Sequence, residues 1–183
     1  MAKGCLNKLS GNITVGCTIP QVGIKNIYLM HTEDVTFTVA GIAGSTITGA
    51  TIPAGAAVIL VEGYKQNIQI SSSVRAMDAS AKLDINVSFK MPMKSDADFL
   101  RARSLLAGKF YVAVEHNDGT LATVGYTSPL ECSGMDWDSN ANAGLVTVTL
   151  SAPEGSAGNY FMITAPAAMN SIKSKVITCL TLS

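Results

Sequence analysis

Ionised side chains are scarce in this sequence of 183 residues. Asp, Glu, Lys and Arg together make up only 14% of it, against roughly 25% in typical soluble globular proteins. The 13 basic residues are balanced by 13 acidic ones, so there is no net field to attract phosphate groups, and we do not expect a tightly held nucleic acid. A surface with so little charge indicates that other protein covers much of it.

Cysteine pairs at metal-binding spacing are also lacking. Cys5, Cys17, Cys132 and Cys179 are far apart and form no CxxC pair and no Cys/His cluster, which argues against a zinc site. We favour reduced, buried thiols, with two disulfides as the alternative.

Catalytic motifs are missing as well. The sequence contains two histidines, His31 and His116, and no GxSxG, P-loop, GxGxxG or HExxH motif. His116 adjoins an expected hairpin turn, where an exposed polar side chain is usual. We therefore predict no catalytic residue, no cofactor and no enzymatic activity.

One short sequence matches part of a calcium-binding loop but lacks two of its required residues. Asp136–Asn140 resembles the start of a calcium loop, but Ala141 stands where that loop needs Gly and Thr147 where it needs Glu. We favour an Asx-rich turn and predict no metal ligand, with a structural cation as the alternative.

Neither a leader nor a membrane span is predicted. The N-terminus has no apolar run of signal-peptide length, so we expect synthesis in the cytoplasm. Residues Val35 to Val61 carry no charge and are long enough to cross a bilayer, but Thr, Ser, Gly and Pro interrupt them. We expect two strands joined by a flexible, uncharged loop, Gly41 to Gly55, and no membrane contact.

Strand-forming patterns dominate what is present. Runs of Val, Ile, Thr, Tyr and Phe recur about every ten residues between Gly, Asn, Asp or Pro. Within Lys82 to Met91, apolar and polar residues alternate, which is typical of a half-buried antiparallel strand. Asn117-Asp118-Gly119 between two such runs predicts a hairpin. The expected strands are Ile13–Ile19, Ile24–Met30, Val35–Val39, Ala57–Tyr64, Asn67–Met77, Lys82–Met91, Phe110–His116, Thr120–Tyr126, Leu145–Ser151, Tyr160–Thr164 and Lys175–Leu182.

One segment has helical spacing instead. Ser95 with Asp98 three residues later predicts a capping box, and Gly108 predicts a left-handed stop. An apolar stripe between them predicts an amphipathic helix packed on the sheet. The stripe consists of Phe99, Ala102, Leu105 and Leu106.

These elements predict the fold class. We expect one domain over residues 1–183, mostly β within the α+β class. Its form should be an antiparallel β-sandwich or barrel with one flanking helix, about residues 95–107, and a long early loop.

Five pieces follow one another in the second half of the chain. They are an alternating strand (LDINVSFKM), a helix (DFLRARSLL), a hairpin (KFYVAVEHNDGTLATVGYTSPL), a polar loop (SGMDWDSNANAG) and a closing strand (LVTVTLSAPE). In this order they resemble tail-tube and related virion proteins of tailed bacteriophages. The earlier piece CTIPQVGIKNIYLMHTEDV resembles the opening of structural proteins from phages of gut Bacteroides-type hosts.

The resemblance implies a structural subunit of the virion. It implies a β-sandwich of tail-tube type, a homo-oligomeric ring, most simply a hexamer, and a lumen through which genomic DNA passes without specific binding. Sheets of neighbouring subunits would join into one barrel, which removes exposed strand edges. Assembly would take place in the bacterial host cytoplasm, with other tail, neck or capsid proteins as partners.

The resemblance also suggests subunit contacts. In that family a long loop between early strands reaches the next ring, and Gly41 to Gly55 stands at a suitable place. Ile42, Ile47 and Ile52 are the candidate contacts, because they could be buried as the loop becomes ordered at assembly. Trp137, in the expected polar loop, is a further candidate. The alternative is a mobile surface loop without a partner.

Other function classes stay open at this point. A capsid decoration protein or a head-to-tail completion protein would be another virion role. A surface adhesin would need the signal peptide that we do not find, and an enzyme would need a supported catalytic cluster.

Overall fold

The computed structural model describes residues 23–41, 45–63, 67–77, 80–93, 95–137, 145–153, 156 and 158–176. Within them the chain is mostly β, with two helices and an open, mixed sheet. The strands are β1 (Ile24–His31), β2 (Thr36–Ala40), β3 (Thr46–Thr51), β4 (Val58–Glu62), β5 (Ile68–Met77), β6 (Ser80–Pro92), β7 (Lys109–His116), β8 (Leu121–Val124), β9 (Leu130–Trp137), β10 (Leu145–Ser151) and β11 (Met162–Thr164). The helices are α1 (Asp96–Ala107) and α2 (Pro166–Lys173), with a 3-10 turn at Thr32–Asp34.

Strand β7 is the centre of the hydrogen-bonded network. The strand order is β2-β3-β11-β8-β7-β9-β10-β6-β5, and β1 joins from the side by pairing with both β7 and β4. One part of β7 pairs with β8, whereas its first residues, Lys109 and Phe110, pair with β9. Gly125, at φ 92°, lies where the chain leaves β8 and turns toward β9. A Cβ there would lie 3.0 Å from the Phe110 carbonyl oxygen, so glycine suits this corner.

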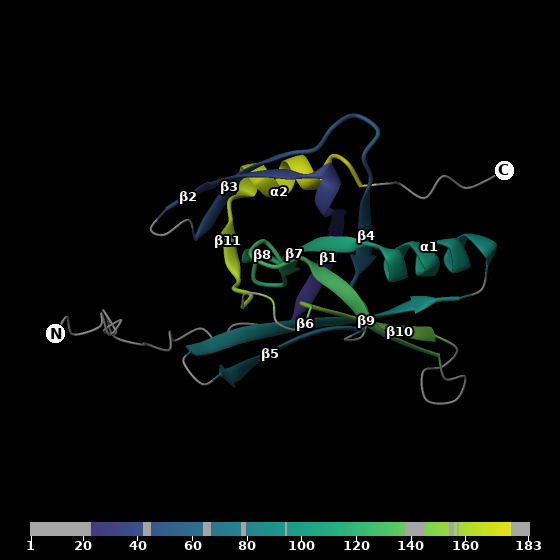
Figure 1. The fold of residues 1–183 in the computed structure, drawn as a ribbon. Helices are drawn as coiled ribbons and strands as arrows, with labels where there is room; N and C mark the ends of the chain where they lie inside the picture. The colour runs from purple at the N-terminus through teal and green to yellow at the C-terminus, as the bar shows by residue number, and fades with distance from the viewer. Residues whose placement is uncertain are drawn as a thin grey trace.

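The elements lie at three levels (Figure 1). Strands β1, β4, β7 and β8 occupy the middle, β5, β6, β9 and β10 lie below them, and α2 with β2 and β3 lies above. Helix α1 extends to one side, and β11 lies toward the opposite side. The molecule therefore has two different ends, one bearing a helix and one bearing strands.

The larger core lies between the middle and lower levels. Fully buried residues such as Leu29 on β1 and Val114 on β7 pack with Val87 on β6 and Val148 on β10 in one cluster. These β-branched and aliphatic side chains alternate along their strands, as the sequence pattern predicted. Burying each large one contributes about 1.5–3 kcal/mol.

A second core lies on the other side of the middle strands. Tyr28 and Met30 alternate with the inward residues of β1 and face Met169 and Ile172 of α2. Because β1 is buried on both faces, its run of four buried residues is continuous rather than alternating. Helix α2 thus covers a face of the sheet that would otherwise be exposed to solvent.

Most sequence predictions of strands are confirmed where the structure describes the chain. The strands β1, β2, β4, β5, β6, β7, β8 and β10 lie within two or three residues of their expected bounds, and β11 covers the last residues of its expected run. The mostly β class is confirmed, whereas a purely antiparallel sheet is not, since β3 and β11 run parallel. The expected strand at 13–19 lies outside the described residues, as does 177–182 of the last one. Val176 makes only an isolated bridge with Val58.

Three local predictions are wrong, and one helix was missed. The expected flexible loop at 41–55 contains strand β3, and the expected polar loop at 132–144 begins as strand β9. A second helix, α2, was not predicted. Gly108 ends α1 in an extended conformation, φ −97°, rather than a left-handed one. Its lack of a side chain matters for another reason, because a Cβ there would collide with the Phe110 ring.

Candidate functional site

Glu115, near the end of β7, is a charged side chain that is only 8% exposed. Lys173 of α2 and Lys25 of β1 approach its Oε1 atom with their Nζ atoms at 2.9 Å and 3.3 Å. The Tyr28 hydroxyl donates a hydrogen bond to Oε2 at 3.0 Å, and the Asn26 amide donates at 3.5 Å. Residues from strand β1 and helix α2 therefore converge on one carboxylate of β7.

The protonation states of this cluster suit a structural role. Burial raises the pKa of Glu115, but hydrogen bonds from Lys173 and Tyr28 outweigh it and bring the pKa down to about 2. Burial, followed by the hydrogen bond to Glu115, raises the pKa of Tyr28 to about 12. A general acid or base works best with a pKa near neutrality. At neutral pH neither group is poised to exchange a proton, and the cluster instead fastens α2 to the sheet.

The two histidines take no part in the hydrogen bonds described for this cluster. His31 packs edge-on against the Phe110 ring, with 5.4 Å between ring centroids and an interplanar angle of 74°. His116 ends β7 at the hairpin, where Gly119 at φ 84° donates its N–H to the His116 carbonyl. Among the described residues, no group of three His, Cys, Asp or Glu side chains could hold a metal ion.

The calcium-like string begins in a strand. Asp136 and Trp137 pair with Thr147 and Val146 in the ladder between β9 and β10, so these two residues do not form the expected Asx-rich turn. Residues 138–141 lie outside the described part of the chain, and so does the rest of that prediction.

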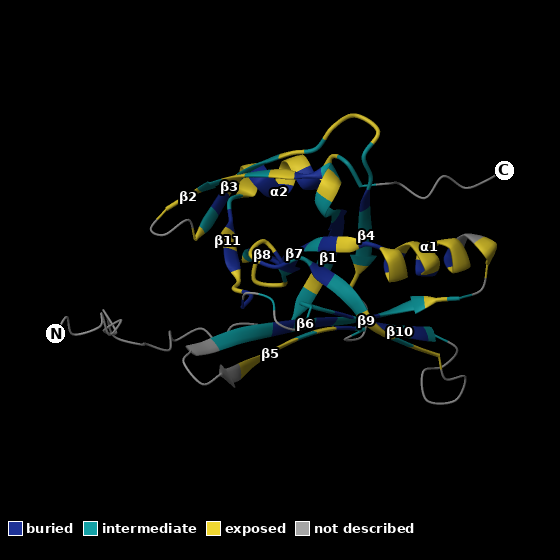
Figure 2. Ribbon diagram, in the orientation of Figure 1, coloured by how far each residue is buried: buried dark blue, intermediate teal, exposed yellow. Residues whose placement is uncertain are grey.

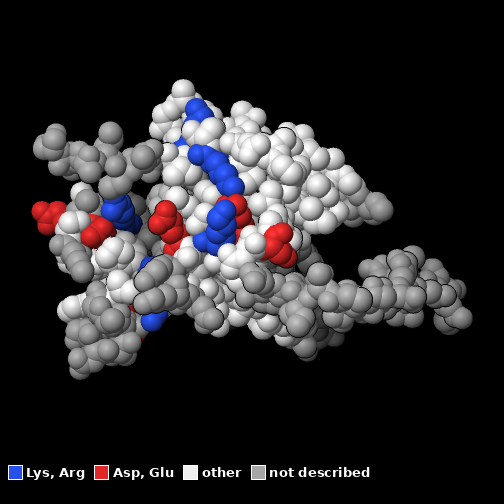
Figure 3. Space-filling view, turned by 180° about the vertical axis from the view of Figure 1, so that it is seen from behind, with Lys and Arg blue, Asp and Glu red and all other residues white. Residues whose placement is uncertain are grey.

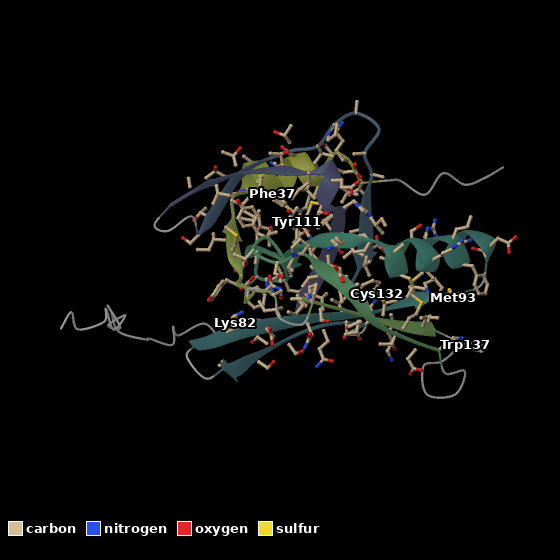
Figure 4. All side chains as sticks on the ribbon, viewed as in Figure 1. Phe37, Lys82, Met93, Tyr111, Cys132 and Trp137 are labelled. Atoms are coloured by element: carbon tan, nitrogen blue, oxygen red, sulfur yellow. The ribbon has the colours of Figure 1, made fainter. Side chains whose placement is uncertain are left out.

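One cysteine is described. Cys132 on β9 is a half-buried free thiol that packs against the larger core (Figure 4), and burial raises its pKa. The expectation of reduced, buried thiols stays a prediction. Cys5, Cys17 and Cys179 lie outside the described residues.

The four predicted subunit contacts differ in how far they are buried. Ile42 lies outside the described residues. Ile47 is fully buried on β3, in a cluster with Met162 and Ala168 of the same chain. It is therefore unavailable to a neighbour, and its assignment as a contact is wrong, because the uncharged segment folds into a paired strand under α2. Ile52 is half-buried against the α2 side of the sheet, and Trp137 is largely exposed.

Large apolar side chains are exposed at both ends of the molecule. Helix α1 buries only part of its predicted stripe, because Ala102 and Leu105 face the core while the other two members do not. Figure 2 shows exposed residues along most of this helix. The exposed fractions are 57% for Phe99, 64% for Leu100, 59% for Leu106, 65% for Trp137, 54% for Tyr160, 44% for Phe161 and 65% for Ile163.

Sequence analysis missed the group near β11. Tyr160 and Phe161 precede β11, and Ile163 lies within it. A sequence clue was present, since no charged residue occurs between Glu154 and Lys173. An uncharged stretch containing exposed aromatic residues is typical of a surface that another protein covers.

Charge is distributed unevenly over the surface. In the view from behind, Lys, Arg, Asp and Glu side chains lie across the middle and at the end formed by α1, while the end formed by β2 and β3 is free of them (Figure 3). The sequence accounts for this, because no charged residue lies between Asp34 and Glu62. Strand β2 is also the last strand in the sheet order, so its outer edge lacks a partner strand among the described residues.

Neither a membrane-spanning helix among the described residues nor a match to a known family or curated protein is found. Among the described helices, none has the length and apolar content needed to cross a bilayer. Comparison with models of known protein families gives no match, and neither does comparison with curated proteins.

Proposed function

We propose that this chain is a structural, non-enzymatic subunit of a tailed-phage virion that assembles with itself into rings of the tail tube or neck. The observation that carries the proposal is the combination of large exposed apolar side chains with a charge-free sheet end. Monomeric soluble proteins rarely expose contiguous apolar surface beyond a few hundred Å². Sister subunits would cover these areas in the assembled particle.

The edges of the sheet support the same proposal. Strand β2 ends the sheet order at one side and β5 at the other. Natural proteins usually protect such edges with Lys or Pro, yet β2 consists of Thr, Phe, Val and Ala only. Pairing of edges between neighbours would close the open sheets into a barrel of tail-tube type, which the sequence resemblance implies.

The balance of charge fits a channel for DNA rather than a DNA-binding site. A protein that grips DNA neutralises phosphates with clustered basic residues. This chain has equal numbers of basic and acidic residues, and both Lys25 and Lys173 are paired with Glu115 in the structure. A lumen lined by such a protein would let DNA pass during delivery without holding it.

Imaging the purified full-length protein tests the proposal. We expect rings or short tubes in negative-stain electron microscopy, and a mass of several subunits by light scattering. A protein that stays monomeric up to its solubility limit would contradict it. A trimer, or a monomer that coats isolated capsids without forming rings, would instead support a decoration or head-to-tail completion role.

A further inference from the structure

Two surfaces at opposite ends of the molecule differ in construction. The helix-end surface consists of Phe99, Leu100, Leu106 and Trp137, and the strand-end surface consists of Tyr160, Phe161 and Ile163. Helix α1 lies at one end and β11 toward the other (Figure 1). Figure 4 places Trp137 at the same end as α1.

We infer that the helix-end surface of one subunit docks on the strand-end surface of the next copy of this chain. The inference rests on the proposed self-assembly and names the surfaces that would carry it. It also sets the symmetry, because a contact between two different surfaces is head-to-tail and produces a closed ring or a filament.

The amount of apolar surface matches what a stable contact needs. Phe99 and Trp137 are 57% and 65% exposed, which amounts to roughly 200–300 Å² at about 150–250 Å² for a whole aromatic side chain. Leu100 and Leu106, each more than half exposed, add to this area. A standard interface buries about 800 Å² on each partner, somewhat more than half of it apolar. The helix-end surface can therefore supply most of the apolar part of one interface.

Symmetry favours the head-to-tail arrangement over a two-fold dimer. A two-fold contact joins one surface to the same surface of a second copy, so it would cover either end but not both. In a head-to-tail ring every subunit uses both of its ends. This arrangement therefore removes both of the surfaces defined above from water.

The chemistry of the two surfaces is complementary. Arg103 is exposed and lies between Phe99 and Leu106 on the same helix stripe, at i+4 and i+7. A guanidinium group can bind the face of an aromatic ring through a cation–π interaction, which needs no oppositely charged side chain. Tyr160 and Phe161 supply such rings at the strand end. The stretch around them has no charged side chain, so no charge would lose its hydration when this surface is covered.

The strand end can receive a helix without rearrangement. Phe161 and Ile163 are two residues apart, so their side chains lie on the same side of an extended chain. The Cα partners of Ile163 are Thr46 on β3 and Ala122 on β8, both small and uncharged. The Ile163 side chain therefore stands above its neighbours, and α1 of a second copy can pack against it.

Complementation between two variants tests the inference. Leu106→Asp removes the helix-end surface and Ile163→Asp removes the strand-end surface. Burying either carboxylate in an apolar contact should weaken self-association at least about 100-fold, so each variant alone should sediment as a monomer. An equimolar mixture should form 1:1 heterodimers, because one intact surface of each kind remains.

The control is Ala167→Asp on α2, an exposed apolar position that belongs to neither surface and to no strand edge. It should assemble like the wild type. If either end variant assembles alone, if the mixture stays monomeric, or if Ala167→Asp is equally defective, the pairing of these surfaces is wrong. A wild-type protein that never associates would contradict the proposed function itself, so the two failures are distinguishable.

Discussion

The two helices of this protein are held by different means. Helix α1 begins with a complete capping box, in which Ser95 and Asp98 satisfy each other's backbone N–H groups. It buries few large side chains. Helix α2 begins at Pro166 without a side-chain cap, but buries three of its eight residues, and Lys173 joins Glu115. Local signals therefore stabilise α1, whereas tertiary contacts stabilise α2.

This difference shows where each helix is sensitive. A helix maintained by its own cap can leave apolar side chains free for a partner, as α1 does with Phe99 and Leu106. A helix maintained by packing has no such freedom, since its apolar face is already used. The comparison can be sharpened by making similar changes at both helices.

The largest effect is expected beneath α2. Ile47→Asp places a carboxylate in the fully buried cluster with Met162 and Ala168, and we expect a loss of more than about 4 kcal/mol in the free energy of unfolding. The same change at Leu106 on α1 should cost less than about 0.5 kcal/mol, because that site is exposed. Urea denaturation followed by circular dichroism measures both. Equal losses would show that α1 is not the less packed helix.

A smaller effect is expected at the ion pairs of the two helices. Glu115→Gln leaves Lys25 and Lys173 without a carboxylate, and we expect a loss of about 1–2 kcal/mol at pH 7, since both lysines are partly exposed. Arg101→Gln, which removes the exposed partner of Asp98 in α1, should cost less than about 0.5 kcal/mol.

The Glu115 effect should depend on pH in a defined direction. The pKa of Glu115 falls from its usual 4.5 to about 2 on folding, so the unfolded chain binds the proton more tightly. The stabilisation is complete above pH 4.5 and is lost as pH falls from there through 2. The stability difference between wild type and Glu115→Gln should therefore shrink over this range. A difference that is constant between pH 7 and pH 3 would contradict the assigned pKa.

The smallest effect is expected at the helix starts. Ser95→Ala removes the hydroxyl that accepts the Asp98 N–H at 3.3 Å, and we expect a loss of about 1 kcal/mol. Ala165→Ser, which adds a cap to α2, should change stability by at most about 0.5 kcal/mol, because packing already sets the start of that helix. Hydrogen exchange at the Asp98 amide should become faster in Ser95→Ala. Unchanged exchange would show that tertiary contacts maintain this turn too.

The sequence predicted the elements that carry their own signals. Alternation in β6 and the Asn117–Gly119 turn gave strands close to the observed ones, and the Ser95–Asp98 box gave α1. It missed β3 and β9, where Gly, Thr and Ser weaken the strand pattern and pairing with neighbours decides the outcome. Among the candidate contacts that the structure describes, only Trp137 is largely exposed, and its role in assembly stays a prediction.

The sequence by itself determined the scarcity of charge, the mostly β class, the position of α1 and the uncharged stretch between Asp34 and Glu62. Only the tertiary structure decided that Ile47 is core, that α2 covers the sheet and that Leu106 stays exposed. The physical reason is that burial depends on residues far away in the chain. A segment rich in hydrophobic residues is expected to be buried. Only the fold determines whether the same chain or a second one buries it.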